Sequence, residues 1–264
     1  MDETAHPESG RDANTASEAA AEYRRQLARW AQDLALAERA SVAANLADGS
    51  SDLHVKLFTD GNLDKRFNKL QNALEFVAGA FQDFDDLLAA YVRALPLAAY
   101  DTGSSDAERF LEWLADRHPL TPEQRDYVAC QRGRFAVENA ARANRPGHVR
   151  FQELAGAAAE SAVALDAHPG LQLYFNPIHA WSRFHTSALL DEEATPPANV
   201  LFYAAGTEIA TAVLEPAGQL LVRSLALYTP CTLDDWAAMN QHADRDELLE
   251  FCRDLAEMGL VAFG

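Results

Sequence analysis

The pattern of apolar and polar positions begins with a tail and then a helix. Residues 1–17 are polar and show no period, so we expect a disordered tail there. From Ser17 onward, apolar residues such as Tyr23, Leu27 and Trp30 recur at steps of three and four, with alanine between them. This spacing is typical of an amphipathic helix. The ordered part of the chain is therefore predicted to begin with helices.

The middle of the chain predicts further helices with recognisable starts. Thr121 precedes Pro122 and Glu123, and this order suits a helix start because Thr caps, Pro fits the first turn and an acid favours the positive end of the dipole. The predicted helices follow Asp60 or Asn62 as cap up to Gly79, cover 81–95 before Pro96, cover 106–118 after Ser104 or Ser105, and run from Thr121 to about Asn144.

Three stretches give ambiguous patterns. LHVKLF at 53–58 alternates like a short strand. After a break at RPGH (145–148), the stretch 151–165 fits either a short helix or an alanine-rich link. NPIHAWSRFHTSALLD at 176–191 fits a helix or a wide excursion of the chain.

The C-terminal part alternates as strands do. Apolar residues alternate in LQLYF (171–175), and the short stretches NVLFY (199–203) and EIATAVL (208–214) also have the pattern of strands, which predicts three strands. Short helical segments follow and end in EFCRDLAEMGLVAF (250–263). Strands followed by a triplet of helices outline a small winged-helix-like module, a kind of module that binds a nucleic acid groove or a peptide more often than it catalyses.

The length supports two domains. At 264 residues, with 48% hydrophobic residues, the chain can bury a sizeable core. We expect an α+β protein with an α-helical domain at 18–165, followed by a winged-helix-like module with a small antiparallel sheet at 166–264. No run of about 18 apolar residues is present, and the first residues lack the order of a signal peptide. A cytoplasmic protein without a membrane partner is therefore expected.

The charge weighs against nucleic acid as a partner. The sequence holds 40 acidic and 22 basic side chains, a formal net charge of −18. Affinity for phosphate depends heavily on Lys and Arg, so this charge repels nucleic acid. Two interpretations of the acidity stay open, namely solubility and attraction to a basic peptide or partner surface.

Catalytic and metal-binding patterns are scarce. The three cysteines, Cys130, Cys231 and Cys252, lie far apart without CxxC spacing, so neither a disulfide framework nor a thiolate zinc site is predicted. His179 and His185 are six apart, which is off the spacing that places two ligands on one helix face. Cys231 precedes a predicted helix start, where a thiolate is favoured, and is the one candidate nucleophile.

The strand at 208–214 offers a different kind of site. Its alternate side chains point to opposite faces, and both faces are apolar enough to be covered. If this is an edge strand, its free N–H and C=O groups can pair with an added strand. The last helix could flank such a strand with one apolar stripe, formed by Leu248, Phe251, Leu255 and Met258. The competing interpretation is that these residues close the module's own core.

Residues 196–261 resemble the PqqD-like peptide-recognition element of pathways that make ribosomal peptide natural products. The resemblance rests on the two strands, a helix at 219–227, a helix start at Thr232-Leu233 and a last helix that ends in L-x-x-x-G-L-V from Leu255. The earlier part resembles a family, named for a proposed DNA-binding domain, of partner proteins that accompany multinuclear non-haem iron-dependent oxidases. The matching segments are 66–96, 108–140 and 168–184.

These resemblances imply a non-catalytic subunit without a cofactor of its own. The partner oxidase would hold the iron and modify a cysteine or neighbouring residue of a precursor peptide. This chain would bind the peptide's leader by strand addition, between 208–214 and 246–258, while the helical domain docks the enzyme. The implied peptide-binding residues are Glu208, Ile209, Ala210, Thr211, Ala212, Val213, Leu214, Leu248, Phe251, Cys252, Leu255 and Met258.

Two alternatives belong to other classes. A winged-helix regulator that binds DNA would need a basic recognition helix, but the last two helical segments, 232–242 and 244–258, hold two arginines against eight acids. A cysteine-dependent enzyme would use Cys231 as its nucleophile.

Overall fold

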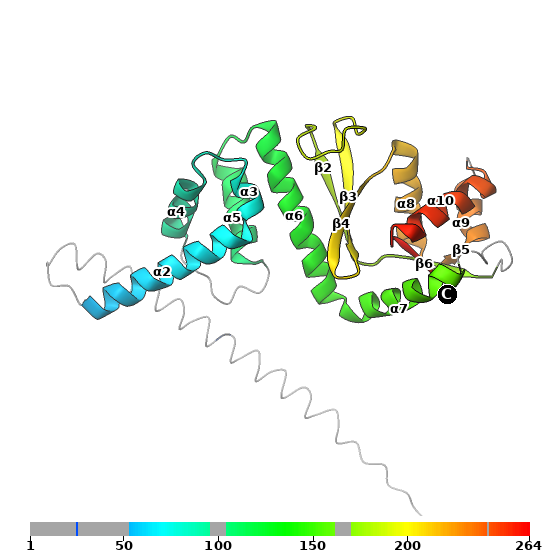
Figure 1. Ribbon diagram of the computed structural model, residues 1–264, viewed down its shortest axis with the longest axis horizontal. Helices are drawn as coiled ribbons and strands as arrows, with labels where there is room; N and C mark the ends of the chain where they lie inside the picture. The colour runs from blue at the N-terminus through cyan, green and yellow to red at the C-terminus, as the bar shows by residue number, and fades with distance from the viewer. Residues whose placement is uncertain (1–24, 26–52, 96–103, 162–169, 242) are drawn as a thin grey trace, which may run out of the picture. The chain divides into compact units, whose positions relative to one another are not determined.

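The computed structural model describes residue 25 and residues 53–95, 104–161, 170–241 and 243–264 (Figure 1). The tail predicted at 1–17 and nearly all of the helix predicted from Ser17 lie outside these residues. Within them the chain is α+β, with helices in the N-terminal part and strands in the C-terminal part, as predicted. The chain divides into two compact units, Met1–His118 and Pro119–Gly264.

The first unit is helical in its described part. Its elements are α2 (Leu53–Ala73), α3 (Glu75–Ala78), α4 (Phe84–Ala94) and α5 (Asp106–Arg117). Leu74, Leu88 and Phe110 are fully buried between these helices. The ring of Phe110 lies edge-on to Phe84 and Tyr91, with centroid distances of 5.6 and 5.3 Å. The predicted cap of α5 is confirmed, because Ser105 and Glu108 form a reciprocal capping box.

The strand predicted at 53–58 is wrong, because α2 already begins at Leu53. Positions 60 and 62 consequently lie inside α2 and not at its start. Six residues of alternation also fit a helix, and lengthening an existing helix adds one hydrogen bond for each residue that is ordered. The strong helical pattern after residue 60 therefore allows the helix to extend toward the N-terminus as far as Leu53.

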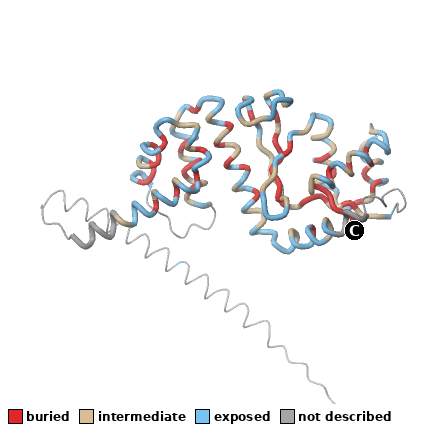
Figure 2. Tube along the Cα trace, viewed as in Figure 1, coloured by how far each residue is buried: buried red, intermediate tan, exposed pale blue. Residues whose placement is uncertain are grey.

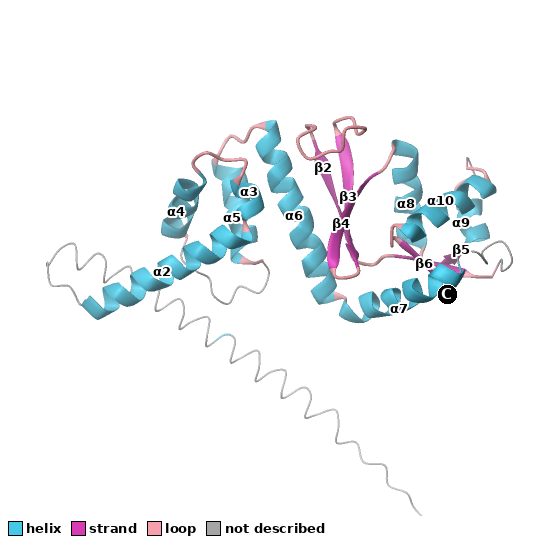
Figure 3. Cartoon of the chain, in the orientation of Figure 1, coloured by secondary structure: helices cyan, strands magenta, loops and turns pink. Residues whose placement is uncertain are grey.

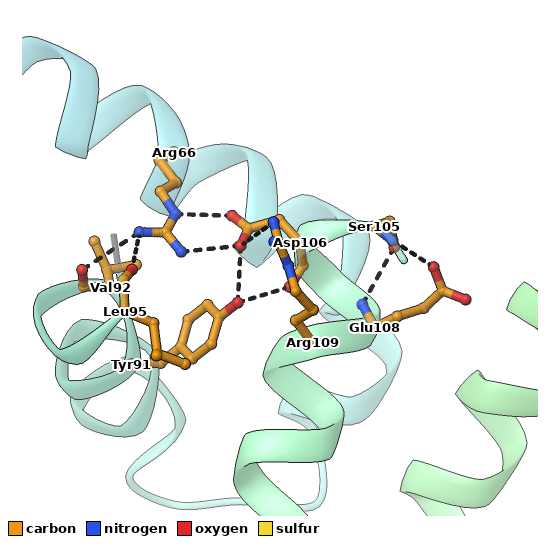
Figure 4. Close-up of polar contacts among 8 residues, drawn as sticks. All are labelled: Arg66, Tyr91, Val92, Leu95, Ser105, Asp106, Glu108 and Arg109. Atoms are coloured by element: carbon orange, nitrogen blue, oxygen red, sulfur yellow. Dashed lines mark hydrogen bonds and ion pairs between the residues drawn. The ribbon is translucent and has the colours of Figure 1, made fainter. Parts of the chain in front are cut away.

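A buried polar network joins three helices of the first unit (Figure 4). Arg66 of α2 binds Asp106 of α5 with two parallel hydrogen bonds of 2.8 and 2.9 Å. Its third nitrogen donates to the carbonyl of Leu95 at 2.7 Å, at the end of α4. Tyr91 of α4 donates its hydroxyl to Asp106 at 2.8 Å. A single guanidinium thus ties α2, α4 and α5 together.

The second unit begins with two helices, α6 (Pro122–Ala143) and α7 (Arg145–Ser161). Thr121 caps α6 with a capping box to Gln124, as its sequence predicts. The undecided stretch at 151–165 lies in α7 as far as Ser161. The sequence predicts a helical domain that runs to residue 165, whereas the two compact units part after His118 and α6 packs on β2 and β3.

Two antiparallel sheets form the strand part of this unit (Figure 3). One sheet has the order β2-β3-β4, from β2 (His179–Phe184), β3 (Ala198–Ala205) and β4 (Glu208–Val213). The other has the order β5-β1-β6, from β5 (Cys231–Thr232), β1 (Gln172–Phe175) and β6 (Val261–Phe263). The helix or excursion predicted at 176–191 is wrong over β2, because all six residues of HAWSRF pair with β3.

Three helices complete the second unit, as predicted: α8 (Pro216–Tyr228), α9 (Leu233–Met239) and α10 (Arg245–Glu257). Thr232 caps α9 in a capping box with Asp235. Gly259 follows α10 with a φ of 77°, a left-handed conformation that suits glycine at a helix end. The Gly-Leu-Val of the sequence therefore ends α10 and begins β6.

The sheet β2-β3-β4 lies between two hydrophobic cores, and buried residues run along β3 in Figure 2. On one face, Val200, Phe202 and Ala204 pack with Val137 of α6. On the other face, Leu201 and Tyr203 pack with side chains of α8, α9, α10 and the second sheet. Alternation along β3 thus supplies both cores, which is why the four consecutive residues 200–203 are all apolar.

Gly133 allows α6 to approach β3 closely. A Cβ at this position would lie 2.7 Å from Cδ2 and 2.8 Å from Cε2 of Phe202. The Phe202 ring is fully buried and is held by the core around it. A larger residue at 133 would therefore push α6 away from the sheet.

We expect Gly133→Ala to lower the free energy of unfolding of the second unit by about 1–2 kcal/mol, because the overpacking cost exceeds the gain in helix propensity. Gly156→Ala is the matched control, since Gly156 lies in α7 with nothing within 4 Å of an added Cβ. That control should gain up to about 1 kcal/mol. Urea unfolding curves measure both, and a stabilising Gly133→Ala would contradict the close packing.

Candidate peptide-binding edge

The candidate edge is β4, the outer strand of the sheet β2-β3-β4. A two-residue turn, Gly206-Thr207, joins β3 to β4. Gly206 has a φ of 62°, and no described residue other than glycine has a positive φ. Glycine at the first turn position, followed by a residue of negative φ, is the pattern of a type II′ hairpin turn. The strand predicted at EIATAVL is confirmed over Glu208–Val213, and the structure adds that it is the second strand of a tight hairpin.

Alternate main-chain groups of β4 point away from β3. The N–H of Ala204 donates to the carbonyl of Ile178 on the side of β2, at 3.1 Å. Ala204 lies opposite Ile209, so this pair exchanges no hydrogen bonds between β3 and β4. The N–H and C=O groups of Ile209, Thr211 and Val213 are therefore directed outward. We call these three residues the open edge.

The side chains of β4 are shared between the two cores. Ile209 packs at the margin of the core on the α6 face. Ala210, Ala212 and Leu214 pack against the core on the other face. Thr211 and Val213 remain exposed, with 39% of Val213 accessible. An added strand would thus find apolar side chains on both faces of its neighbour.

Gln219 of α8 marks the C-terminal limit of the edge. Its Nε2 donates to the carbonyl of Leu214 at 2.7 Å, and its Oε1 accepts from Asn199 of β3 at 2.7 Å. The carbonyl of Leu214 is therefore already occupied. The ring of Phe251 lies beside this corner, because Phe251 and Leu214 both lie within 4 Å of a Cβ built at Gly218.

The predicted flanking residues of α10 divide into two groups. Leu248, Cys252 and Leu255 are fully buried in the core that α10 shares with the sheets. Phe251 and Met258 are half-buried and pack at the margin of that core. Phe251 is thus the predicted α10 side chain that lies beside the end of β4, while direct peptide contact by the other four stays a prediction.

A cavity of about 570 Å³, which we call the hairpin cavity, lies beside the start of β4. Helix α6 packs on β2 and β3, and the cavity lies between α6 and the β3–β4 turn. Its lining residues are Arg134, Val137, Glu138, Ala141, His148, Ala204, Gly206, Thr207, Glu208 and Ile209. Among the predicted site residues, only Glu208 and Ile209 line it. The α6 residues could not be found from the sequence, because only the packing of α6 on the sheet brings them beside β4.

The cysteines lie in environments that disfavour the thiolate. Cys231 is buried, and both this burial and the charge of Asp235 raise the pKa of its thiol. Both effects oppose the thiolate that the helix start would favour at Cys231. Burial, followed by the charge of Cys231, raises the pKa of Cys252 to about 12, and burial raises that of Cys130 to about 11.

No group of three or more His, Cys, Asp or Glu side chains in the described ranges is arranged to hold a metal ion. None of the helices described for this chain is both long and apolar enough to cross a membrane. No protein-family model matches the chain, and no curated protein or solved structure matches it either.

Proposed function

We propose that the chain is a non-catalytic partner subunit that binds the leader of a ribosomally made precursor peptide by strand addition to β4. It presents the peptide to a multinuclear iron-dependent oxidase that modifies a cysteine or neighbouring residue. The observation that carries this proposal is the open edge, where Ile209, Thr211 and Val213 direct their main-chain groups away from β3. The iron belongs to the partner enzyme, and the complex works in the cytoplasm.

Strand addition suits this edge for a physical reason. Main-chain hydrogen bonds supply affinity for an extended peptide, and side-chain contacts on the two faces supply selectivity. The other outer strand, β2, is covered by α6, where Ser182 donates its hydroxyl to the carbonyl of Ala129 at 3.1 Å. We favour β4 over β2 because β4 has apolar side chains on both faces, Ile209 on one and Ala210, Ala212 and Leu214 on the other.

The exposed charge favours a basic peptide over nucleic acid. Acidic residues of α9 and α10 are exposed, whereas the winged-helix alternative would need a basic helix there. These exposed acids are Asp234, Asp235, Asp246, Glu247, Glu250, Asp254 and Glu257. Tethering the peptide beside the enzyme raises its effective concentration without new chemistry, which is the role that we assign to the subunit.

The direct experiment is co-purification of the full chain with the oxidase encoded beside its gene, followed by titration with the leader of the neighbouring precursor peptide. We expect a stable complex with the oxidase and saturable leader binding. Absence of affinity for both would refute the proposal. Duplex DNA is titrated in parallel, and capture of DNA in place of the leader would favour the winged-helix regulator.

Val213→Pro tests the edge itself. The N–H of Val213 points outward and has no partner within the sheet, so proline is tolerated by the fold but removes a ladder donor. We expect leader affinity to fall by about tenfold or more, because one bond is lost and an acceptor of the peptide stays unpaired. Binding of the oxidase should persist.

Val213→Ala is the matched control, because it shortens the same side chain and keeps the N–H. It should lose less affinity than Val213→Pro in isothermal titration with the same leader. Equal losses would assign the effect to the side chain, and unchanged affinity in both variants would place the leader elsewhere.

A further inference from the structure

Helix α8 exposes two leucines in line on its outer side. Leu220 and Leu227 are the most exposed large apolar residues in the described ranges, at 71% and 75%, whereas Val222 and Leu225 of the same helix are fully buried. Seven positions make almost two helical turns, so Leu220 and Leu227 lie within about 20° of each other around the helix axis. An exposed apolar stripe of this kind is typical of a surface that contacts another protein.

Arg223 lies on the same side of α8, between the two leucines. Its guanidinium carbon lies 4.7 Å from the centre of the Trp181 ring of β2. This cation–π contact holds the guanidinium in place and uses none of its five N–H donors. Arg223 is exposed and forms no hydrogen bond or ion pair with another described residue. Its donors therefore remain available to a ligand.

Arg183 adds a second unpaired cation beside the first. Alternation along β2 places Arg183 on the same face of the sheet as Trp181, which packs against the core on the α8 side. Asn199, which lies opposite Arg183 on β3, donates to Gln219 of α8 at 2.7 Å on that side. Arg183 is exposed and also lacks a hydrogen bond or ion pair with any described residue. We call Trp181, Arg183, Leu220, Arg223 and Leu227 the α8 face.

The α8 face has no carboxylate to balance its two arginines. Residues 216–228 of α8 include no Asp or Glu, and Glu215 lies eight positions before Arg223, which is about 12 Å along the helix axis. On the neighbouring helix α9, Asp234 is paired with Arg245, and Asp235 is bonded to Thr232 in the capping box. The formal charge of the whole chain is −18, so this surface is an exception that fits an acidic group.

We propose that the α8 face docks an amphipathic helix of a partner protein that carries a glutamate or aspartate beside its apolar stripe. The apolar side chains of that helix cover Leu220 and Leu227, and its carboxylate binds Arg223, whose planar guanidinium matches a carboxylate with two parallel hydrogen bonds. A free anion would leave both leucines in water. This proposal goes beyond the proposed function and does not depend on it, because it uses no residue of the open edge.

The first experiment uses a pair of model peptides as the probe. Each is a capped helical peptide of about 15 residues, with leucines at every third or fourth position in an alanine and glutamine background. One peptide has a single glutamate beside the leucine stripe, and the other has glutamine there. The full chain, labelled with ¹⁵N, is titrated with each peptide. We expect saturable shifts at the α8 amides and binding of the glutamate peptide that is about three- to tenfold tighter. Equal binding of the two peptides, or shifts away from α8, would overturn the proposal.

Charge variants separate a local contact from the general field of the protein. Arg223→Gln should lower the affinity of the glutamate peptide by about three- to tenfold, to that of the glutamine peptide, and should leave the affinity of the glutamine peptide unchanged. Arg125→Gln is the matched control, because Arg125 is an exposed arginine of α6, which packs on the opposite face of the sheet. Equal losses in the two variants would assign the preference to the general field and would overturn the proposal.

An apolar variant tests the leucine stripe and the identity of the occupant. Leu227→Gln should weaken binding of both peptides by about tenfold, because the apolar contact is lost. Val149→Gln is its control, since Val149 is 44% exposed on α7 and should leave binding unchanged. Sedimentation of the full chain without peptide should show a monomer. Unchanged peptide binding in Leu227→Gln would overturn the proposal, and so would self-association that this variant abolishes, because the occupant would then be a second copy of the chain.

Discussion

Replacing Asn176 with aspartate is expected to lower the free energy of unfolding of the second unit by about 3–5 kcal/mol. Asn176 is fully buried between β1 and β2. Its Nδ2 donates to the carbonyl of Ala204 at 2.8 Å and to that of Gly259 at 3.1 Å, and its Oδ1 accepts from Ile178 at 2.9 Å. One amide thus joins the end of β3 to the turn after α10.

The substitution Asn176→Asp removes both donors and places a carboxylate oxygen against two carbonyl oxygens. The introduced carboxyl has a raised pKa in the folded state, so the folded state binds its proton more tightly than the unfolded state. The deficit in stability should therefore be largest near neutral pH and should shrink as the pH falls through that raised pKa. Urea unfolding at two pH values measures the size of the stability deficit and the direction in which it changes with pH.

Asn199→Asp is the matched control for this variant. Asn199 is half-buried and donates one hydrogen bond, to Gln219 at 2.7 Å. Loss of this hydrogen bond should lower the free energy of unfolding by about 1 kcal/mol. If Asn176→Asp costs no more than Asn199→Asp, the amide of Asn176 does not join the two sheets in the way that its contacts indicate.

The features that the sequence predicted well are local ones. Thr121 with Gln124 and Ser105 with Glu108 cap helices through contacts three residues apart, so the residues themselves contain the whole signal. The same holds for the strands predicted at 199–203 and 208–214, which the structure confirms as parts of β3 and β4. Neither feature needs knowledge of the rest of the fold.

The features that the sequence could not predict depend on distant partners. HAWSRF became β2 because β3 pairs with all six of its residues, and β3 begins fourteen positions after the end of β2. Helix α6 belongs with the strands because its small residues, Gly133 above all, fit against Phe202. Cys231 lost its expected thiolate because the core encloses it. In each case tertiary packing decided between local alternatives.

The candidate site shows the same division. The strand at 208–214 could be predicted from the sequence, but its place at the edge follows from the sheet order β2-β3-β4, which no local pattern contains. Whether α10 offers its apolar stripe to a peptide or to its own core depends on packing, and Leu248, Cys252 and Leu255 lie in the core. The hairpin cavity needs α6, α7 and the β3–β4 turn together, and no local pattern links them.

Replacing Arg66 with methionine should lower the free energy of unfolding of the first unit by about 3 kcal/mol. Arg66 and Asp106 expose only 8% and 19% of their side chains, so the carboxylate would stay largely buried without its cation. The carbonyl of Leu95 would also lose its donor. Methionine keeps the aliphatic stem, so the loss in stability measures the contribution of the guanidinium and its hydrogen bonds (Figure 4).

The pH dependence of this stability loss shows whether it comes from the contact between Arg66 and Asp106. Burial alone would raise the pKa of Asp106, but hydrogen bonds from Arg66 and Tyr91, together with the charges of Arg66 and Arg109, hold it below the ordinary value of 3.8. A carboxyl whose pKa is depressed in the folded state adds stability above its unfolded pKa and loses it as the pH falls through the folded value. The advantage of the parent chain over Arg66→Met should therefore be full near pH 7 and should shrink as the pH falls below about 3.8.

Arg93→Met is the control for Arg66→Met, because it makes the same change on the exposed face of α4. No ion pair joins Arg93 to another described residue, so its replacement should change stability by less than about 0.5 kcal/mol. Hydrogen exchange of the α4 and α5 amides in the full chain resolves the first unit from the second. Equal protection in the two variants, or a deficit that does not change between pH 7 and pH 3, would mean that the guanidinium of Arg66 does not hold these three helices together.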